Sequence, residues 1–163
     1  MRFEQMVILL LSITVLSSSV VASAQARPPA QPAGESFTVL AQGTTSAIDR
    51  ERFAVIRDEA AFKALWNQHN AGVSPTPPVP EVNFSKDMVI AGFAGTRDTG
   101  GYVLRFDALL RKGNDLEARL TLMQPSNQCM VAQMMTAPFV LVTTHRNSLR
   151  VSFKRDTKIS PQC

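Results

Sequence analysis

The sequence predicts a single α+β domain, in which one main helix packs on a mostly antiparallel sheet of about six or seven strands. The apolar run Met88–Ala94 is too short for an ordinary helix and is rich in Val, Ile and Phe, which favours a strand buried on both faces. Several other short runs are rich in β-prone residues, whereas Glu59–Asn70 has its apolar residues at helical spacing. Once a leader is removed, roughly 125 residues would remain, which suits one domain with one core.

Residues 1–24 are expected to be a signal peptide. A short charged start leads into the apolar run Met6–Leu16 and then into small residues. Two small-x-small sites end at Ala24 and Ala26, and cleavage after Ala24 is favoured because the later cut would leave an Arg-Pro pair at the new terminus. An uncleaved membrane anchor is the alternative interpretation.

The mature chain is expected to begin with a flexible leader, residues 25–35, which is rich in Pro and Ala and poor in large apolar residues. Residues 36–163 would then form the folded domain. Because a cleaved signal peptide indicates export, we expect a periplasmic or extracellular protein that has no membrane association after cleavage.

The charge pattern argues against a nucleic-acid partner. The formal net charge is +4 at pH 7, and the Lys and Arg residues are scattered along the chain rather than clustered. The sequence also contains only one Trp and one Tyr that could stack on bases. It therefore lacks the basic footprint that nucleic-acid binding requires.

The first elements after the leader are two short β-prone runs, Phe37–Gln42 and Arg52–Ile56, which flank a polar turn and are expected to pair with each other. Asp58 predicts the N-cap of the helix over Glu59–Asn70, and Gly72 is expected to end it. The apolar stripe of this helix should pack on the sheet and consists of Phe62, Leu65, Trp66 and His69.

His69 lies at the edge of that stripe, a position more typical of a packed histidine than of a ligand or a base. The proline-rich run Val73–Val82 that follows cannot continue a helix and lacks donors for a central strand. It predicts an extended surface loop, with a proline-rich ligand for a partner domain as the alternative.

A strand that begins at Tyr102 is expected to pair with Asp115–Met123 through the three-residue loop Lys112–Asn114. This register gives one wholly apolar face. Its facing pairs are Leu110 with Leu116, Ala108 with Ala118, Phe106 with Leu120, and Leu104 with Leu122.

The opposite face of the same predicted pair sets Asp107 across from Arg119. A two-residue loop, Gly113–Asn114, is the alternative. It would place Leu110 opposite Glu117 and interrupt the apolar face, so the three-residue loop is favoured.

The C-terminal third is less regular. The run Cys129–Met135 is apolar and ambiguous between a short strand and a turn of helix. Phe139–Thr144 and Leu149–Lys154 are expected to form a closing hairpin around a polar turn. Four methionines of this region are expected to be mostly core residues, with an adaptable contact surface as the alternative: Met123, Met130, Met134 and Met135.

The two cysteines, Cys129 and Cys163, are interpreted in the light of export to an oxidising compartment. An intramolecular disulfide between them would tie down the last residue of the chain. A buried free Cys129 with a frayed Cys163, or an intermolecular bridge, are the alternatives. A catalytic thiol is disfavoured, because neither cysteine has a neighbour in the sequence that resembles an activating base.

No pattern of catalytic or metal-ligating residues is found in the sequence. The two histidines, His69 and His145, belong to different predicted elements, and the carboxylates are few and stand mostly among basic neighbours. The pair Gly100–Gly101 lacks the glycine spacing and the following helix of a phosphate-binding loop. We therefore expect a protein that is not an enzyme and that has no cofactor and no metal site.

Several groups of residues together carry a family resemblance. They are Phe53–Arg57 leading to Leu65–Trp66, then Phe84–Ala91, then Gly95–Arg97 before Thr99–Tyr102, and finally Pro125, Cys129 and Pro138. Here the chain resembles the C-terminal domain family of PrcB, the small subunit of a bacterial protease complex, over about residues 53–153. The resemblance implies a PrcB-like domain with a non-catalytic accessory role, which binds and stabilises a partner protease.

The glycine turn is the predicted partner-binding site. Its residues are Arg97, Asp98, Thr99, Gly100, Gly101 and Tyr102. The glycines indicate a bulge or a tight turn that serves the fold, and an exposed loop that inserts into a partner groove is the functional interpretation of the same residues. A weaker resemblance to the chagasin-like inhibitors of cysteine proteases, which use a Thr-Gly-Tyr-like turn, makes protease inhibition an alternative. Another binding function in the cell envelope is a further one.

Overall fold

The computed structural model describes residues 34–161 of the chain. The predicted signal peptide and most of the predicted leader fall in residues 1–33, outside the described residues. The chain divides into two units, residues 1–30 and residues 31–163, and the description that follows concerns the second unit alone. Gly34 and Glu35, the last two residues of the predicted leader, form a short strand.

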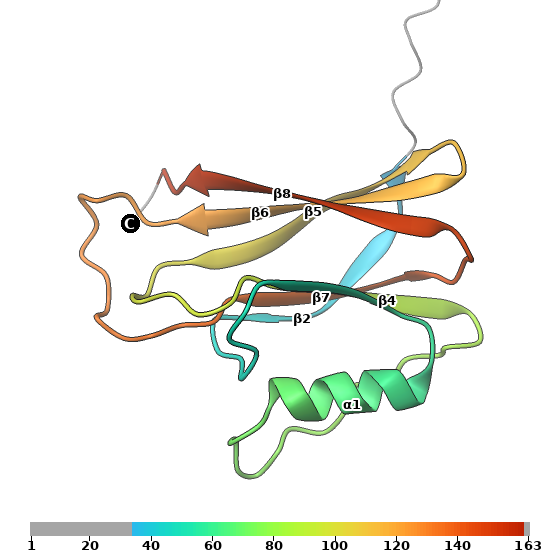
Figure 1. Cartoon of the computed structure of the whole chain (residues 1–163), viewed down its shortest axis with the longest axis horizontal. Coiled ribbons are helices and arrows are strands. Elements are labelled where there is room, and N and C mark those ends of the chain that lie inside the picture. Colours follow the sequence, from blue (N-terminus) through green and yellow to red (C-terminus); the bar gives the residue numbers. More distant parts are fainter. Residues whose placement is uncertain (1–33, 162–163) are drawn as a thin grey trace, which may run out of the picture. The chain divides into compact units, whose positions relative to one another are not determined.

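Eight strands and one helix make up the described residues. In chain order they are β1 (Gly34–Glu35), β2 (Phe37–Gly43), β3 (Arg52–Ile56), α1 (Glu59–His69), β4 (Asp87–Phe93), β5 (Val103–Lys112), β6 (Asp115–Gln124), β7 (Phe139–His145) and β8 (Arg150–Ile159). They form two four-stranded sheets, with strand orders β1-β5-β6-β8 and β2-β7-β4-β3 (Figure 1). The predicted strand-rich fold is confirmed in part: the described residues contain one short helix, but there are eight strands instead of six or seven, and they form two sheets instead of one. Over residues 34–161, no helix is long and apolar enough to span a bilayer.

Strand β4 is central, as its sequence predicts. Met88 and Ile90 point into the core between the two sheets, where they join leucines of β5 and β6. Val89 and Ala91 point to the other face of the same sheet, where α1 covers them. An unbroken apolar run is therefore required here, because both faces of β4 are buried.

Helix α1 begins and packs as predicted. The carboxylate of Asp58 accepts a 2.8 Å hydrogen bond from the backbone N–H of Ala61, which is the bond of an N-cap residue. All four residues of the predicted stripe are buried against the sheet: Phe62, Leu65, Trp66 and His69. His69 is the packed histidine that was expected. It is 4% exposed, and its ring lies 4.1 Å from that of Phe139, centroid to centroid.

The predicted pairing of the first two long strands is wrong. β2 pairs with β7 and β3 pairs with β4, so β2 and β3 lie at opposite edges of one sheet. The reason is the distribution of apolar residues. β4 and β7 are buried along almost their whole length and therefore occupy the centre of the sheet, which leaves the half-buried β2 and β3 at its edges.

The predicted closing hairpin is also wrong, because β7 and β8 belong to different sheets. β8 runs parallel to β6, from the pair Asp115 and Arg150 to the pair Gln124 and Ile159. The connection between β7 and β8 is held by Arg57, whose guanidinium donates hydrogen bonds of 3.0 and 2.8 Å to two carbonyl oxygens of that connection. The chain thus crosses from one sheet to the other instead of turning back.

The pairing of β5 with β6 follows the predicted register only in its first half. Leu104 faces Leu122 and Phe106 faces Leu120 as expected, but a bulge between Phe106 and Ala108 shifts every later pair by one residue. The hairpin therefore closes through the two-residue turn Gly113–Asn114, so the predicted three-residue loop is wrong. The inner face remains apolar in the shifted register, because the bulge turns Leu109 into the core. Leu109 is only 1% exposed.

The bulge also changes the partner of Asp107. Its carboxylate accepts a 2.6 Å hydrogen bond from the hydroxyl of Thr121 instead of facing Arg119. The Arg119 guanidinium pairs with the carboxylate of Glu117 at 2.7 Å, and Lys112 binds the other oxygen of Glu117 at 2.6 Å. The predicted pair of Asp107 with Arg119 is therefore wrong.

Candidate functional site

The predicted glycine turn follows β4 directly and is bonded to a distant segment of the chain. Arg97 and Thr136 exchange two backbone hydrogen bonds, of 2.7 and 2.9 Å. The hydroxyl of Thr136 also donates to the carbonyl oxygen of Thr99 at 2.8 Å. The backbone N–H of Gly100 donates to the carbonyl oxygen of Ala132, again at 2.8 Å. The turn and the segment before β7 therefore form one structural unit.

The side chain of Arg97 makes contacts inside this unit. Its guanidinium donates a 2.7 Å hydrogen bond to the carbonyl oxygen of Ala94 and lies 5.9 Å from the centroid of the Tyr102 ring. Contacts of this kind between a guanidinium and an aromatic face are attractive. Both side chains are half-buried. Through its contact with Tyr102, Arg97 links the turn to the residue before β5.

The surroundings of the turn require a glycine at position 101 but not at position 100. Gly101 has a φ of +84°, a conformation that L-residues avoid, and a Cβ at this position would lie 2.9 Å from a methyl group of Val131 and 3.0 Å from Pro125. Gly100 is buried against Ala132. A Cβ at Gly100 would make only ordinary contact with Ala132, at 3.4 Å, so the structural role predicted for the glycines is supported at Gly101 alone.

The six predicted partner-binding residues differ in exposure. Asp98 and Gly101 are exposed, Arg97, Thr99 and Tyr102 are half-buried, and Gly100 is buried. The turn is thus covered in part by the segment to which it is bonded. That these residues bind a partner stays a prediction.

The sequence predicted the wrong environment for most of the methionines of that segment. Met130, Met134 and Met135 are 100, 60 and 70% exposed, so the expectation that most of this group packs in the core is wrong for them. Large apolar side chains gathered at the surface within six residues are unusual and often mark a contact site. The apolar run Cys129–Met135 was ambiguous between a short strand and a turn of helix, and an adaptable contact surface was only the alternative expectation for its methionines.

A third loop completes this end of the molecule. The backbone N–H of Ala137 donates to the carbonyl oxygen of Thr44 at 2.8 Å, and that of Thr96 to the carbonyl oxygen of Asp49 at 2.9 Å. A hollow of about 180 Å³ lies where the loops meet, lined by Thr44, Thr45, Ser46, Thr96, Met135, Thr136 and Ala137. We call residues 44–49, 95–102 and 125–137 together the loop end. The last two of these segments lie at the left of Figure 1, in yellow-green and orange.

Cys129 lies in the loop end, immediately before the exposed Met130. Its predicted disulfide partner, Cys163, is outside the described residues. The pairing of the two cysteines therefore stays a prediction.

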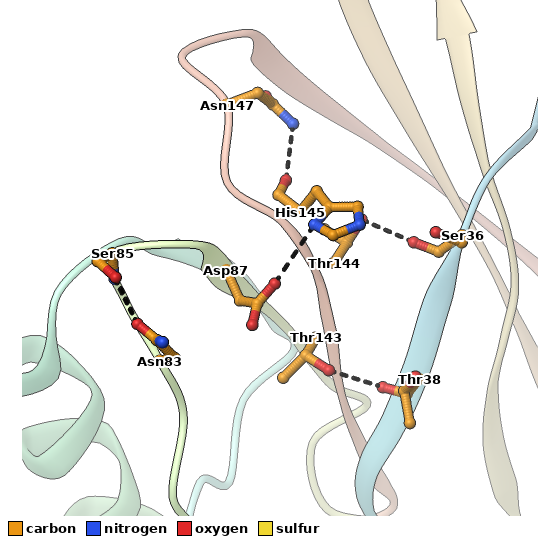
Figure 2. A network of polar contacts seen from close by, with 9 residues as sticks. All are labelled: Ser36, Thr38, Asn83, Ser85, Asp87, Thr143, Thr144, His145 and Asn147. Carbon is orange, nitrogen blue, oxygen red and sulfur yellow. Dashed lines mark hydrogen bonds and ion pairs between the residues drawn. The ribbon is translucent and has the colours of Figure 1, made fainter.

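A second polar cluster lies where β4 begins and β7 ends (Figure 2). Asp87 and His145 face each other in the ladder, and the distance from His145 Nδ1 to a carboxylate oxygen of Asp87 is 3.6 Å. The hydroxyl of Thr144 donates to the carbonyl oxygen of Ser36 at 2.8 Å. The hydroxyl of a catalytic nucleophile donates its hydrogen bond to a basic side chain, whereas that of Thr144 donates to a backbone carbonyl. We interpret the cluster as structural, because it links the side chains of β7 to Asp87 at the beginning of β4 and to Ser36, the residue before β2.

The resolved pKa shifts arise from packing and surface pairing. Burial lowers the pKa of His69 below its usual value of 6.5. The pKa of Glu117 is lowered by its hydrogen bonds from Lys112 and then Arg119. Within residues 34–161, no three His, Cys, Asp or Glu side chains come together in an arrangement that could hold a metal ion.

Comparison with known proteins gives one match. The family model described as PrcB C-terminal matches residues 88–145, which confirms the resemblance predicted from the sequence over that range. No curated protein and no solved structure matches the chain. The matched range extends from β4 to β7 and contains two of the three segments of the loop end, the glycine turn and the methionine-bearing segment.

Proposed function

We propose that this chain is an exported, non-catalytic accessory module that binds a partner protein, a protease, through the loop end. The observation that carries the proposal is the exposure of Met130, Met134 and Met135 on a segment that is bonded to the glycine turn. The class of partner is taken from the match of residues 88–145 to the PrcB C-terminal family. Export is inferred from residues 1–24.

The three methionines suit protein binding on physical grounds. Methionine is unbranched and polarizable, so it adapts its shape to an irregular apolar surface. Complete burial of one such side chain contributes about 1.5–3 kcal/mol before the costs of association are subtracted. Three neighbouring methionines can therefore supply a substantial part of the binding free energy of a small interface.

The hydrogen bonds of the loop end reduce one of those costs. The segment that carries the methionines is fixed to the turn at Arg97 and Gly100 through backbone groups. A backbone that is already ordered loses less entropy when a partner binds. The side chains remain free to adapt, while the positions of their Cα atoms are set by the fold.

The proposal is tested by capture of proteolytic activity. The full chain, expressed with its own leader and a C-terminal tag, is recovered from an envelope extract, and the retained degradation of a casein substrate is measured. The variant M130Q/M134Q/M135Q should retain at least tenfold less activity than the parent. The control variant V39Q/V73Q, which makes the same change at two exposed valines outside the loop end, should match the parent.

Two results would contradict the proposal. If the parent chain captures no proteolytic activity, a protease partner is ruled out. If the two variants capture equal activity, the loop end is ruled out as the contact surface. Adding purified chain to the captured protease distinguishes an accessory module from an inhibitor. An unchanged or increased turnover fits an accessory module, whereas a dose-dependent decrease would indicate an inhibitor.

A further inference from the structure

We propose that Met130, Met134 and Met135 form a peroxide-sensitive modification site, at which oxidation to methionine sulfoxide switches off binding at the loop end. The reactivity of the site follows from the structure of this chain alone. Its effect on binding rests on the function proposed above.

Access to sulfur separates these methionines from the one in the core. Met130, Met134 and Met135 are 100, 60 and 70% exposed, whereas Met88 on β4 is 0% exposed. A peroxide must approach the sulfur lone pair directly, so the exposed thioethers should react while Met88 is protected. The half-buried Met123, at the end of β6, should react at an intermediate rate.

The chemistry needs only the thioether and a peroxide. One oxygen atom passes from hydrogen peroxide to the sulfur. The O–O bond breaks as the S–O bond forms, and the rest of the peroxide leaves as water. The sulfur loses two electrons and the peroxide gains them. The product is a polar sulfoxide that methionine sulfoxide reductases convert back to the thioether.

The fold should tolerate this change, because the segment is held through its backbone. Its bonds to the turn are those of Ala132 with Gly100 and of Thr136 with Arg97 and Thr99. None of them uses a methionine side chain. Oxidation therefore leaves the loop end in place and changes only the chemistry of its surface.

Binding should nevertheless fall, because a sulfoxide oxygen accepts hydrogen bonds from water. Burying that oxygen against an apolar partner surface removes those bonds, and this cost applies at each of the three positions. The exposed methionines thus give the loop end a reversible response to peroxide.

The first experiment maps the sites. The folded full chain is treated with graded hydrogen peroxide, quenched and digested, and the gain of one oxygen at each methionine is followed by mass spectrometry. Met130, Met134 and Met135 should oxidise at least tenfold faster than Met88. Oxidation of Met88 at the same rate as these three would overturn the proposed site.

The second experiment measures the switch at a peroxide dose that oxidises the three methionines and spares Met88. Capture of casein-degrading activity from an envelope extract should fall at least fivefold, the melting temperature should stay unchanged, and treatment with methionine sulfoxide reductases should restore capture. Unoxidised chain carried through the same reductase treatment is the control.

The outcomes separate this inference from the proposed function. If untreated chain captures a protease and oxidised chain captures it equally well, the proposed function stands and the switch is wrong. If untreated chain captures no protease, the proposed function fails, and the regulatory role fails with it. A melting temperature that falls with capture would show that oxidation unfolds the chain, which also overturns the switch.

Discussion

The backbone N–H of Gly100 donates a 2.8 Å hydrogen bond to the carbonyl oxygen of Ala132. This bond joins the glycine turn after β4 to the methionine-bearing segment before β7, and the two bonded residues are 32 positions apart in the sequence. A change in the turn should therefore alter how the methionines are presented, even where it touches none of them.

The first prediction concerns Gly101. Gly101→Ala must place a Cβ 2.9 Å from a methyl group of Val131 at a φ of +84°. Gly113 provides a matched control, because it also has a positive φ but nothing lies within 4 Å of its Cβ position. Gly113→Ala should cost about 1–2 kcal/mol from the backbone conformation alone. Gly101→Ala should cost about 1–3 kcal/mol more from overpacking.

Urea unfolding of the two variants and the parent measures this difference. Equal losses of stability in the two variants would show that Val131 and Pro125 do not confine Gly101, and the close packing of the loop end would be contradicted.

The second prediction concerns the helix. Trp66 is buried between α1 and the sheet, and its indole N–H donates a 2.9 Å hydrogen bond to the carbonyl oxygen of Pro77. Trp66→Ala should lower the free energy of unfolding by about 3–5 kcal/mol, since it removes a large buried aromatic. Lys63→Ala, on the exposed side of the same helix, should be nearly silent. Similar melting temperatures for the two variants would contradict the packing of α1.

The third prediction concerns pH. Burial lowers the pKa of His69 from 6.5, so on acidification the unfolded chain takes up a proton near pH 6.5 while the folded chain resists it. The free energy of unfolding should therefore decrease as the pH falls from about 7 to about 5.5. His69→Gln should flatten this dependence. His145→Gln, at an exposed histidine, should keep it.

Urea unfolding of both variants and the parent across this pH range gives the slopes. The prediction is contradicted if His145→Gln, rather than His69→Gln, removes the dependence.

Local patterns predicted the elements well. The spacing of Phe62, Leu65 and Trp66 identified the buried face of α1, and Asp58 identified its first turn. The unbroken apolar run from Met88 identified a strand buried on both faces. Each of these features depends on neighbouring residues, so the sequence contains the information directly.

Pairing over long distances was predicted less well, because it depends on competition between segments. β2 and β3 are adjacent in the chain, yet each pairs with a more apolar strand. The register of β5 changed at Asp107, because a bulge there buries Leu109 while the hairpin keeps its tight turn. Neither result can be obtained from the alternation of apolar residues alone.

The candidate site was predicted only in part for a similar reason. The glycine turn is visible in the sequence, since adjacent glycines indicate an unusual backbone. The exposure of Met130, Met134 and Met135 is not visible, because methionine is most often a core residue. Only the structure places these side chains at the surface beside the turn.

Site-specific photo-crosslinking tests the central claim, that the loop end contacts a protease, most directly. Benzoylphenylalanine replaces Met134 in one variant and Val73, an exposed valine outside the loop end, in the other. Both variants are irradiated in envelope extract, and the adducts are identified by mass spectrometry. We expect a covalent adduct with a protease from position 134 and none from position 73. A protease adduct from position 73 alone, or no protease adduct from either position, would contradict this claim.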